Sequence, residues 1–225
     1  MDADTPPAEL VALDDIMDPG IFRDPAMLQK IREALLAGQL VMVQNAARLE
    51  VAERMYECLD RLEDWPVQEG YSEHFHYHHH NLYDRSRFPP DLTWCESVFS
   101  SRQTVDFIQR LSGRDCSGET KCFASLYLPG DHSLPHTDAY ANQGLSRQVT
   151  FIWYLAKNWR STWGGEFFWC SGNQYVTPAF NTLLLFLVTN ASFHFVTQVT
   201  PFARGKRLAI TGWWTGPGDP GAPAT

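Results

Sequence analysis

The sequence lacks any long apolar run. Its longest, Thr182–Val188 (TLLLFLV), is far shorter than the roughly 20 residues that a membrane-spanning helix needs. The acidic first residues, MDADTPPAEL, offer neither the basic region nor the apolar stretch of a signal peptide. We therefore expect a cytoplasmic protein with no membrane partner.

Paired cysteines are also missing. The five cysteines are an odd number and include no CxxC pair, which argues against both a disulfide framework and a cysteine zinc site. They are typical of a reducing compartment, and we expect inert thiols. The five are Cys58, Cys95, Cys116, Cys122 and Cys170.

Basic residues are too few to suggest nucleic acid as a partner, since 18 Lys and Arg face 26 Asp and Glu, for a net charge of −8. The segment from His136 to Thr215 differs: it contains six basic residues and only two acids, a local charge of +4. A cationic, aromatic-rich segment in an acidic chain is consistent with a bound anionic small molecule, and also with uneven surface charge. Its charged residues are Arg147, Lys157, Arg160, Arg204, Lys206, Arg207, Asp138 and Glu166.

The first 120 residues predict mainly helices. Asp24-Pro25 and Gly38 are the start and stop signals of one helix, and apolar residues recur at helical spacing over 49–63 and 104–111. Residues 65–95 have no clear period and are rich in His, Tyr and Pro, so we expect an irregular loop there. We expect region 1–120 to pack on the domain that follows.

From residue 121 to 215 the pattern changes to short β-branched and aromatic segments separated by Pro, Gly and Asn, which favours a sandwich or jelly roll over βαβ units. The expected class is α+β, with a flexible tail over 216–225. The predicted strands are Phe123–Leu128, Val149–Leu155, Glu166–Cys170, Gln174–Thr177, Thr182–Val188, Phe193–Val199 and Leu208–Trp214.

Three residues of the second half have the chemistry of a metal site. His136 and Asp138 are two positions apart, so in an extended stretch both side chains point to the same side. His194 follows in another strand-like segment, and two His with one carboxylate form the facial triad of non-haem Fe(II) oxygenases. Arg207, at the start of a later strand, has the guanidinium that binds a carboxylate through two bonds. A His-x-Asp pair alone occurs by chance; the ordered set is more specific.

These residues stand among further motifs in order, and together they resemble the Fe(II)- and 2-oxoglutarate-dependent dioxygenases, in their prolyl-4-hydroxylase-like branch. The resemblance covers Ser125 to Trp214, and residues 1–120 resemble no family. The motifs are Tyr127-Leu128-Pro129-Gly130, His136-Thr137-Asp138, QVTFIWYL (148–155), Trp163-Gly164-Gly165-Glu166, NTLLLF (181–186), His194-Phe195-Val196 and RLAITGWW (207–214).

The resemblance implies a double-stranded β-helix, a distorted jelly roll, with the N-terminal helices packed against one face. It implies that His136, Asp138 and His194 bind Fe(II) and that Arg207 binds the distal carboxylate of 2-oxoglutarate. O₂ is the co-oxidant, with ascorbate as an optional reductant. Three further residues match positions near the cosubstrate: Tyr127, Tyr154 and Thr211.

A site that oxidises an unactivated C–H bond must keep water away, so we expect an aromatic wall around it. Single aromatic residues pack a core more often than they line a site. Trp153 and Trp169 make this wall bulkier than the resemblance leads us to expect. Because related halogenases lack the carboxylate, Asp138 favours hydroxylation or desaturation over halogenation. The expected wall residues are Trp153, Phe168, Trp169, Phe186 and Trp213.

The segment His74–His80 holds five of the eight histidines. We interpret it as a solvated or substrate-facing loop, with an adventitious Zn or Ni site as the alternative.

Three functions remain open. The favoured one is an oxygenase that hydroxylates a small molecule or amino acid, or a prolyl residue in a protein. The alternatives are a non-catalytic jelly-roll binding protein, which has no need of the triad with Arg207, and a Zn hydrolase, which leaves Arg207 without a role.

Overall fold

The computed structural model describes residues 13–72, 75–142 and 144–218. The helices are α1 (Pro19–Phe22), α2 (Pro25–Leu36), α3 (Leu49–Asp60), α4 (Pro90–Ser100) and α5 (Arg102–Ser112), with short 3-10 turns η1 (Leu13–Asp15), η2 (Arg85–Arg87) and η3 (Ser161–Trp163). The strands are β1 (Val41–Gln44), β2 (Val67–Tyr71), β3 (His76–Leu82), β4 (Thr120–Tyr127), β5 (His132–His136), β6 (Ala141–Asn142), β7 (Leu145–Tyr154), β8 (Phe167–Trp169), β9 (Gln174–Val176), β10 (Thr182–Leu187), β11 (His194–Val196) and β12 (Arg207–Pro217).

The predicted helices form for the reasons that the sequence indicated. The side chain of Asp24 accepts a hydrogen bond from the Ala26 N–H at the start of α2, and Gly38 follows its end at a φ of 70°. Ser101 caps α5 in the same way through the Thr104 N–H, and Gly113 ends it. The apolar faces of these helices pack on one face of the sheet, as expected.

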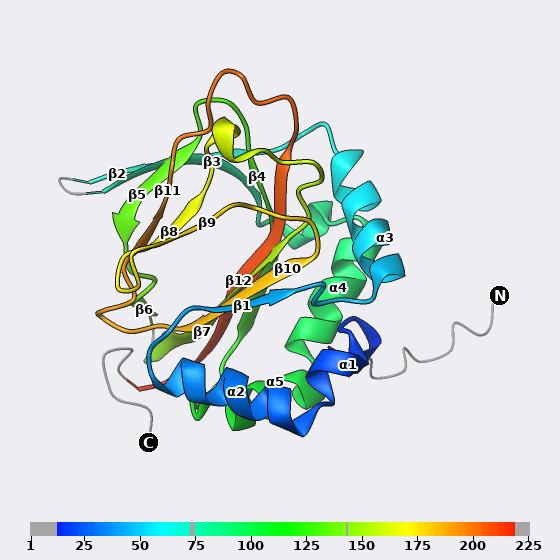
Figure 1. Ribbon diagram of the computed structural model, residues 1–225, viewed down its shortest axis with the longest axis vertical. Coiled ribbons are helices and arrows are strands. Elements are labelled where there is room, and N and C mark those ends of the chain that lie inside the picture. Colours follow the sequence, from blue (N-terminus) through cyan, green and yellow to red (C-terminus); the bar gives the residue numbers. More distant parts are fainter. Residues whose placement is uncertain (1–12, 73–74, 143, 219–225) are drawn as a thin grey trace.

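The strands form one curled antiparallel sheet, in the order β1-β10-β7-β12-β4-β3-β5-β11-β8-β9, with β2 paired to β3 and β6 to β7. In Figure 1 the helices lie along one side of this sheet, and β5, β8 and β11 curl round on the other side. This is the double-stranded β-helix that we predicted, with all seven expected strands present.

Side chains along the central strands alternate between two environments. On β12, Leu208, Ile210 and Trp214 join the main core beneath the helices. Their neighbours Ala209, Thr211 and Trp213 face the inside of the curled sheet. The alternation therefore separates a helix-covered core from an interior that is available for a site.

The irregular loop predicted for residues 65–95 is wrong. This segment forms the β2–β3 hairpin, then η2, and then α4. Strand β3 pairs with β2 along one side and with β4 and then β5 along the other, so pairing with the sheet makes it a strand without any hydrophobic period of its own. His74 of the histidine run lies outside the described residues.

Other boundaries also differ. Strand β1, in the region expected to be mainly helical, pairs with β10 and adds to the sheet. Strand β12 continues to Pro217, so the first residues of the expected tail are paired with β7, while 219–225 lie outside the described residues. Within the described part of the chain, we find no helix with the length and apolarity to traverse a membrane.

Candidate active site

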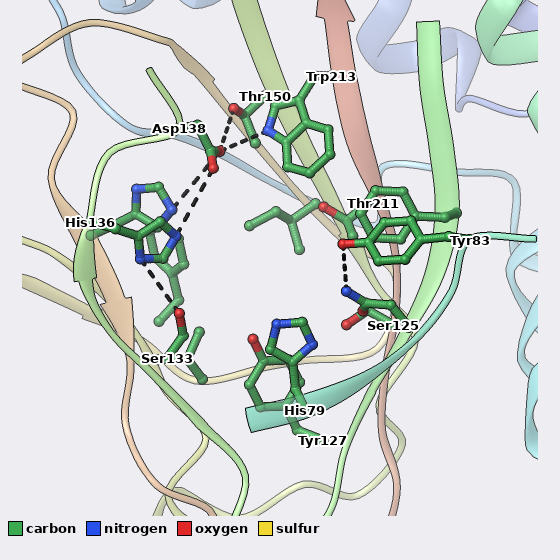
Figure 2. A pocket seen from close by; sticks show the side chains of 16 residues that line it. His79, Tyr83, Ser125, Tyr127, Ser133, His136, Asp138, Thr150, Thr211 and Trp213 are labelled. Carbon is green, nitrogen blue, oxygen red and sulfur yellow. Dashed lines mark hydrogen bonds and ion pairs between the residues drawn. The ribbon is translucent and has the colours of Figure 1, made fainter. Parts of the chain in front are cut away.

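The sheet brings the three predicted metal ligands together. His136 ends β5 and His194 begins β11, and antiparallel pairing places these two residues opposite each other. One ligand atom from each, with one from Asp138, lie within 4.8 Å of one another. Nε2 of His136 is 4.0 Å from Oδ1 of Asp138, and Nε2 of His194 is 3.9 Å from Oδ2 (Figure 2).

Backbone carbonyls orient both imidazoles. Nδ1 of His136 donates to the carbonyl of Leu134 at 2.7 Å, and Nδ1 of His194 donates to that of Ser192 at 2.9 Å. Because a carbonyl only accepts, each Nδ1 carries the proton and each Nε2 keeps its lone pair for a metal. Such a hydrogen bond on the far nitrogen is typical of metal-binding histidines.

The Asp138 carboxylate is held on one side. Its Oδ2 accepts hydrogen bonds from the Thr150 hydroxyl at 2.8 Å and from the Trp213 indole at 2.9 Å. Arg147 approaches Oδ1 at 3.5 Å and stacks over the Trp213 ring. These contacts leave Oδ1 as the more available ligand atom.

The electrostatics keep these ligands in the form that binds a metal. The pKa of His194 is lowered to about 4, mainly by burial, with smaller contributions from His136 and Arg147 and an opposing effect of Asp138, so the ring is neutral at pH 7. Burial opposes ionisation of Asp138, but His194, Arg147 and His136 outweigh it and keep its pKa below the usual value. The donor set therefore fits a two-His-one-carboxylate metal site.

A cavity of about 120 Å³ lies beside the triad, and Figure 2 shows the side chains around it. The expected cosubstrate residues Tyr127 and Thr211 line it, although the Thr211 hydroxyl donates to the Phe151 carbonyl. The other residues that line the cavity come from both halves of the sheet: His79, Asn81, Tyr83, Phe123, Ser125, Ser133, Thr150, Ile152, Phe167, Val196 and Trp213.

Arg207 lies behind Tyr127, next to this cavity. Its guanidinium carbon is 4.5 Å from the centre of the Tyr127 ring, and Nη2 donates to the Tyr154 hydroxyl at 3.1 Å. Nε donates to the carbonyl of Gly165 at 2.5 Å. The side chain is 3% exposed, and no carboxylate of the described residues pairs with it. A buried cation with only neutral partners is costly, so the site is suited to an anion.

The predicted aromatic wall is partly wrong. Trp213 lines the cavity, and Trp169 and Phe186 pack beside His194. Trp153 instead points into the helix-covered core, and Phe168 packs on the outer face against Tyr175 and Phe195. Each of these two residues is next in the strand to residues that face the interior, so its own side chain points to the opposite face. Phe167, which we did not predict, stacks on His194 at 5.1 Å.

Strand alternation also divides the histidine run, which is not a loop. His78 and His80 face outward and contact the buried Asp131 carboxylate at 2.8 and 2.9 Å. His76 is on the same face and lies 2.9 Å from His132. His79 faces the cavity. Within the described residues, the triad is the one cluster with metal-binding geometry, so the adventitious Zn or Ni site finds no support there.

Fold and donor set together define a double-stranded β-helix with a facial triad, as in non-haem Fe(II) oxygenases. Residues 122–215 match the sequence model of the 2OG-Fe(II) oxygenase superfamily, which confirms the resemblance inferred from the motifs. This family implies Fe(II), 2-oxoglutarate and O₂.

Known relatives are similar in both sequence and fold. The prolyl 3-hydroxylase OGFOD1 of Mus musculus is 28% identical over 120 residues, which are 49% of this chain and 21% of the mouse protein. The chain thus spans about a fifth of that relative. A Pseudomonas putida prolyl-4-hydroxylase superposes with a TM-score of 0.63 at 20% identity, covering 85% of this chain and all of the other. A Trichoplax adhaerens prolyl hydroxylase gives a TM-score of 0.54 at 21% identity, covering 85% of this chain and 93% of the other.

Proposed function

We propose that this protein is an Fe(II)- and 2-oxoglutarate-dependent oxygenase that hydroxylates an unactivated C–H bond. The observation that carries the proposal is one arrangement. A triad with both Nε2 atoms directed at Asp138 lies beside a cavity, and a buried arginine with no acidic partner among the described residues lies behind Tyr127, which lines that cavity.

The chain's own residues divide the work. His136, Asp138 and His194 hold the metal, and Thr150 and Trp213 fix the carboxylate between them. Arg207 pairs with a carboxylate of 2-oxoglutarate, beside Tyr127 and Tyr154, while Thr211 lines the pocket. When Fe(II) is bound, it supplies O₂ activation coupled to decarboxylation. One O₂, one 2-oxoglutarate and one C–H group then become succinate, CO₂ and an alcohol.

The alternatives account for less. A binding protein has no use for two histidines whose Nε2 atoms are left free by hydrogen bonds on Nδ1. A Zn hydrolase uses the same donors but gives no role to a buried Arg207.

Two substrate classes fit the proposal. The relatives named as prolyl hydroxylases support a prolyl residue in a protein, and a free amino acid or other small molecule is the second class. A hollow of about 430 Å³ adjoins the cavity at Tyr83 and Trp213 and is the approach for either class. We place the protein in the cytoplasm, which is supported by five free cysteines.

The test is Fe(II)-dependent succinate formation from 2-oxoglutarate, screened with free amino acids and with proline-containing peptides. We expect succinate above the substrate-free level with one class, together with a product heavier by one oxygen atom. If the protein binds neither Fe(II) nor 2-oxoglutarate, the proposal is refuted. Hydrolysis supported by Zn but not by Fe(II) would favour the hydrolase.

A further inference from the structure

The inner face of β3 carries a row of polar side chains that the proposed function does not use. His79, Asn81 and Tyr83 occupy alternate positions of the strand and its end, and all three line the cavity. Figure 2 shows His79 beside Tyr127, across the cavity from Asp138 and Trp213. The outward residues of the same strand contact Asp131 instead. The row is therefore part of the pocket.

His79 and Arg207 both pack against Tyr127. The His79 ring stacks on one side of Tyr127, with centroids 4.9 Å apart and planes 18° apart, and the Arg207 guanidinium lies against the same ring. The pKa of His79 is lowered to about 3, mainly by burial and also by the charge of Arg207 and the neighbouring His136, against a contact with Asn81 that raises it. The imidazole is thus neutral near pH 7 and offers one donor and one acceptor.

Two atoms of this row are buried without a hydrogen-bond partner among the described residues: Nδ1 of His79 and Oδ1 of Asn81. The Asn81 amide donates through Nδ2 to the Tyr83 hydroxyl at 2.8 Å. Because Nδ1 is buried, Nε2 is the ring nitrogen of His79 that is left to meet a ligand in the cavity. A buried polar atom without a partner is costly, so Nδ1 of His79 and the neighbouring Asn81 amide are expected to pair with each other, which leaves Nε2 for a ligand.

The direction of the hydrogen bonds depends on that ligand. If Nδ1–H of His79 points to the Asn81 oxygen, Nε2 is an acceptor. If the Asn81 amide is turned by half a rotation, its N–H₂ meets Nδ1, its oxygen meets the Tyr83 hydroxyl, and Nε2–H is a donor. 2-Oxoglutarate carries only acceptor oxygens at neutral pH, so it selects the second direction.

We propose that His79 is a cosubstrate-binding residue: its Nε2–H donates to a carboxylate oxygen of 2-oxoglutarate, while Asn81 and Tyr83 orient the ring from its Nδ1 side. This inference rests on the proposed function. It adds a neutral donor to the pocket beside the charged Arg207. The neutral ring gives direction without placing a second positive charge next to the guanidinium.

The test is calorimetric titration of 2-oxoglutarate into the full chain loaded with Mn(II), which replaces Fe(II) without turnover. His79→Phe retains the ring on Tyr127 but loses the donor, and we expect binding about 10- to 100-fold weaker, the loss typical of a hydrogen bond to a charged group. His79→Gln restores a donor and should recover most of the affinity. Asn81→Leu should give an intermediate loss. Mn(II) affinity should not change in any of them.

His78→Phe is the matched control, since it changes the outward face of the same strand. Wild-type affinity in His79→Phe, a His79→Gln variant as weak as His79→Phe, or an equal loss in His78→Phe overturns the inference. Binding to the wild type and its loss in Arg207→Ala show whether the proposed function itself holds. If both hold while His79→Phe binds normally, only the role of His79 fails; if the wild type does not bind 2-oxoglutarate, both fail.

Discussion

Arg207 is the residue on which we expect 2-oxoglutarate binding to depend most strongly. It is buried against two tyrosine rings and a backbone carbonyl, and its neutral neighbours leave its charge to a ligand. In Arg207→Ala a bound carboxylate stays buried and unpaired, at a cost of about 2–5 kcal/mol. We therefore expect a roughly 30- to 4,000-fold higher 2-oxoglutarate requirement with nearly unchanged Fe(II) affinity. Arg207→Lys should rescue only in part, because an ammonium lacks the planar fork.

Two neighbouring cations are natural controls. Arg204 is exposed and contacts the Pro201 carbonyl, while Lys206 reaches the backbone of Asp60 and Leu62 outside the pocket. Titration of 2-oxoglutarate against the three alanine variants separates them. A large shift in Arg204→Ala but not in Arg207→Ala would contradict the assignment.

His194 supplies a second prediction at this scale. Its Nε2 is the proposed ligand atom, while its Nδ1 bond to the Ser192 carbonyl orients the ring. His194→Ala should abolish Fe(II)-dependent turnover and leave the circular dichroism spectrum unchanged, since the sheet does not depend on this side chain for its pairing. Metal titration and succinate formation check it. Unchanged activity would remove His194 from the triad.

At the scale of elements, the turn between η3 and β8 holds Arg207 in place. Gly165 has a φ of 67°, its carbonyl accepts from Arg207, and a Cβ at this position would lie 3.0 Å from Cδ of Arg207. Gly165→Ala should therefore weaken 2-oxoglutarate binding in addition to the roughly 1–2 kcal/mol of backbone strain that alanine meets at such a φ.

Gly38 is the control for that strain. Its φ is 70° and a Cβ there would meet nothing within 4 Å. Gly38→Ala should cost similar stability in urea unfolding and leave 2-oxoglutarate affinity unchanged. Equal 2-oxoglutarate affinity in the two variants would mean that the turn does not position Arg207.

The helices and strands also show which parts of the fold could be predicted from the sequence. Helices with capping residues and strands with β-branched runs were predicted in the right places, because their signals are local. Strand β3 was missed because HYHHHNL has no apolar alternation, and its strand form comes from pairing with β4 and β5. The inward direction of Phe167, in place of Phe168, depends on strand parity, which becomes clear only when His194 is paired with Trp169.

The candidate site likewise has residues that the sequence predicts and residues that it does not. The triad and Arg207 were predicted from spacing and motifs, and the structure brings the three triad residues together and places Arg207 behind Tyr127. The residues that hold Asp138 were not assigned to it: Thr150 is 12 and Trp213 is 75 positions away in the chain. Such contacts depend on the register of β7 and β12, which the sequence alone does not specify.

At the scale of the whole molecule, the pocket histidines link stability to pH. In the metal-free protein the pKa of His79 is about 3 and that of His194 about 4, both lowered mainly by burial from an ordinary value of 6.5. The unfolded chain therefore binds these protons first as the pH falls. The contribution of each histidine to the free energy of unfolding is fully present above pH 6.5. It is lost progressively as the pH falls below 6.5, until the pKa of the folded state is reached. Well inside this window, each histidine adds about 1.4 kcal/mol per pH unit to the slope of the unfolding free energy against pH.

We therefore expect the unfolding free energy of the metal-free chain, measured in urea with a chelator present, to fall between pH 7 and pH 5. In His79→Phe the slope should decrease by about one proton, because phenylalanine takes up none in either state. If His79→Phe retains the full wild-type slope, His79 titrates alike in the folded and unfolded chains, and the cavity is wetter at β3 than its buried Nδ1 indicates.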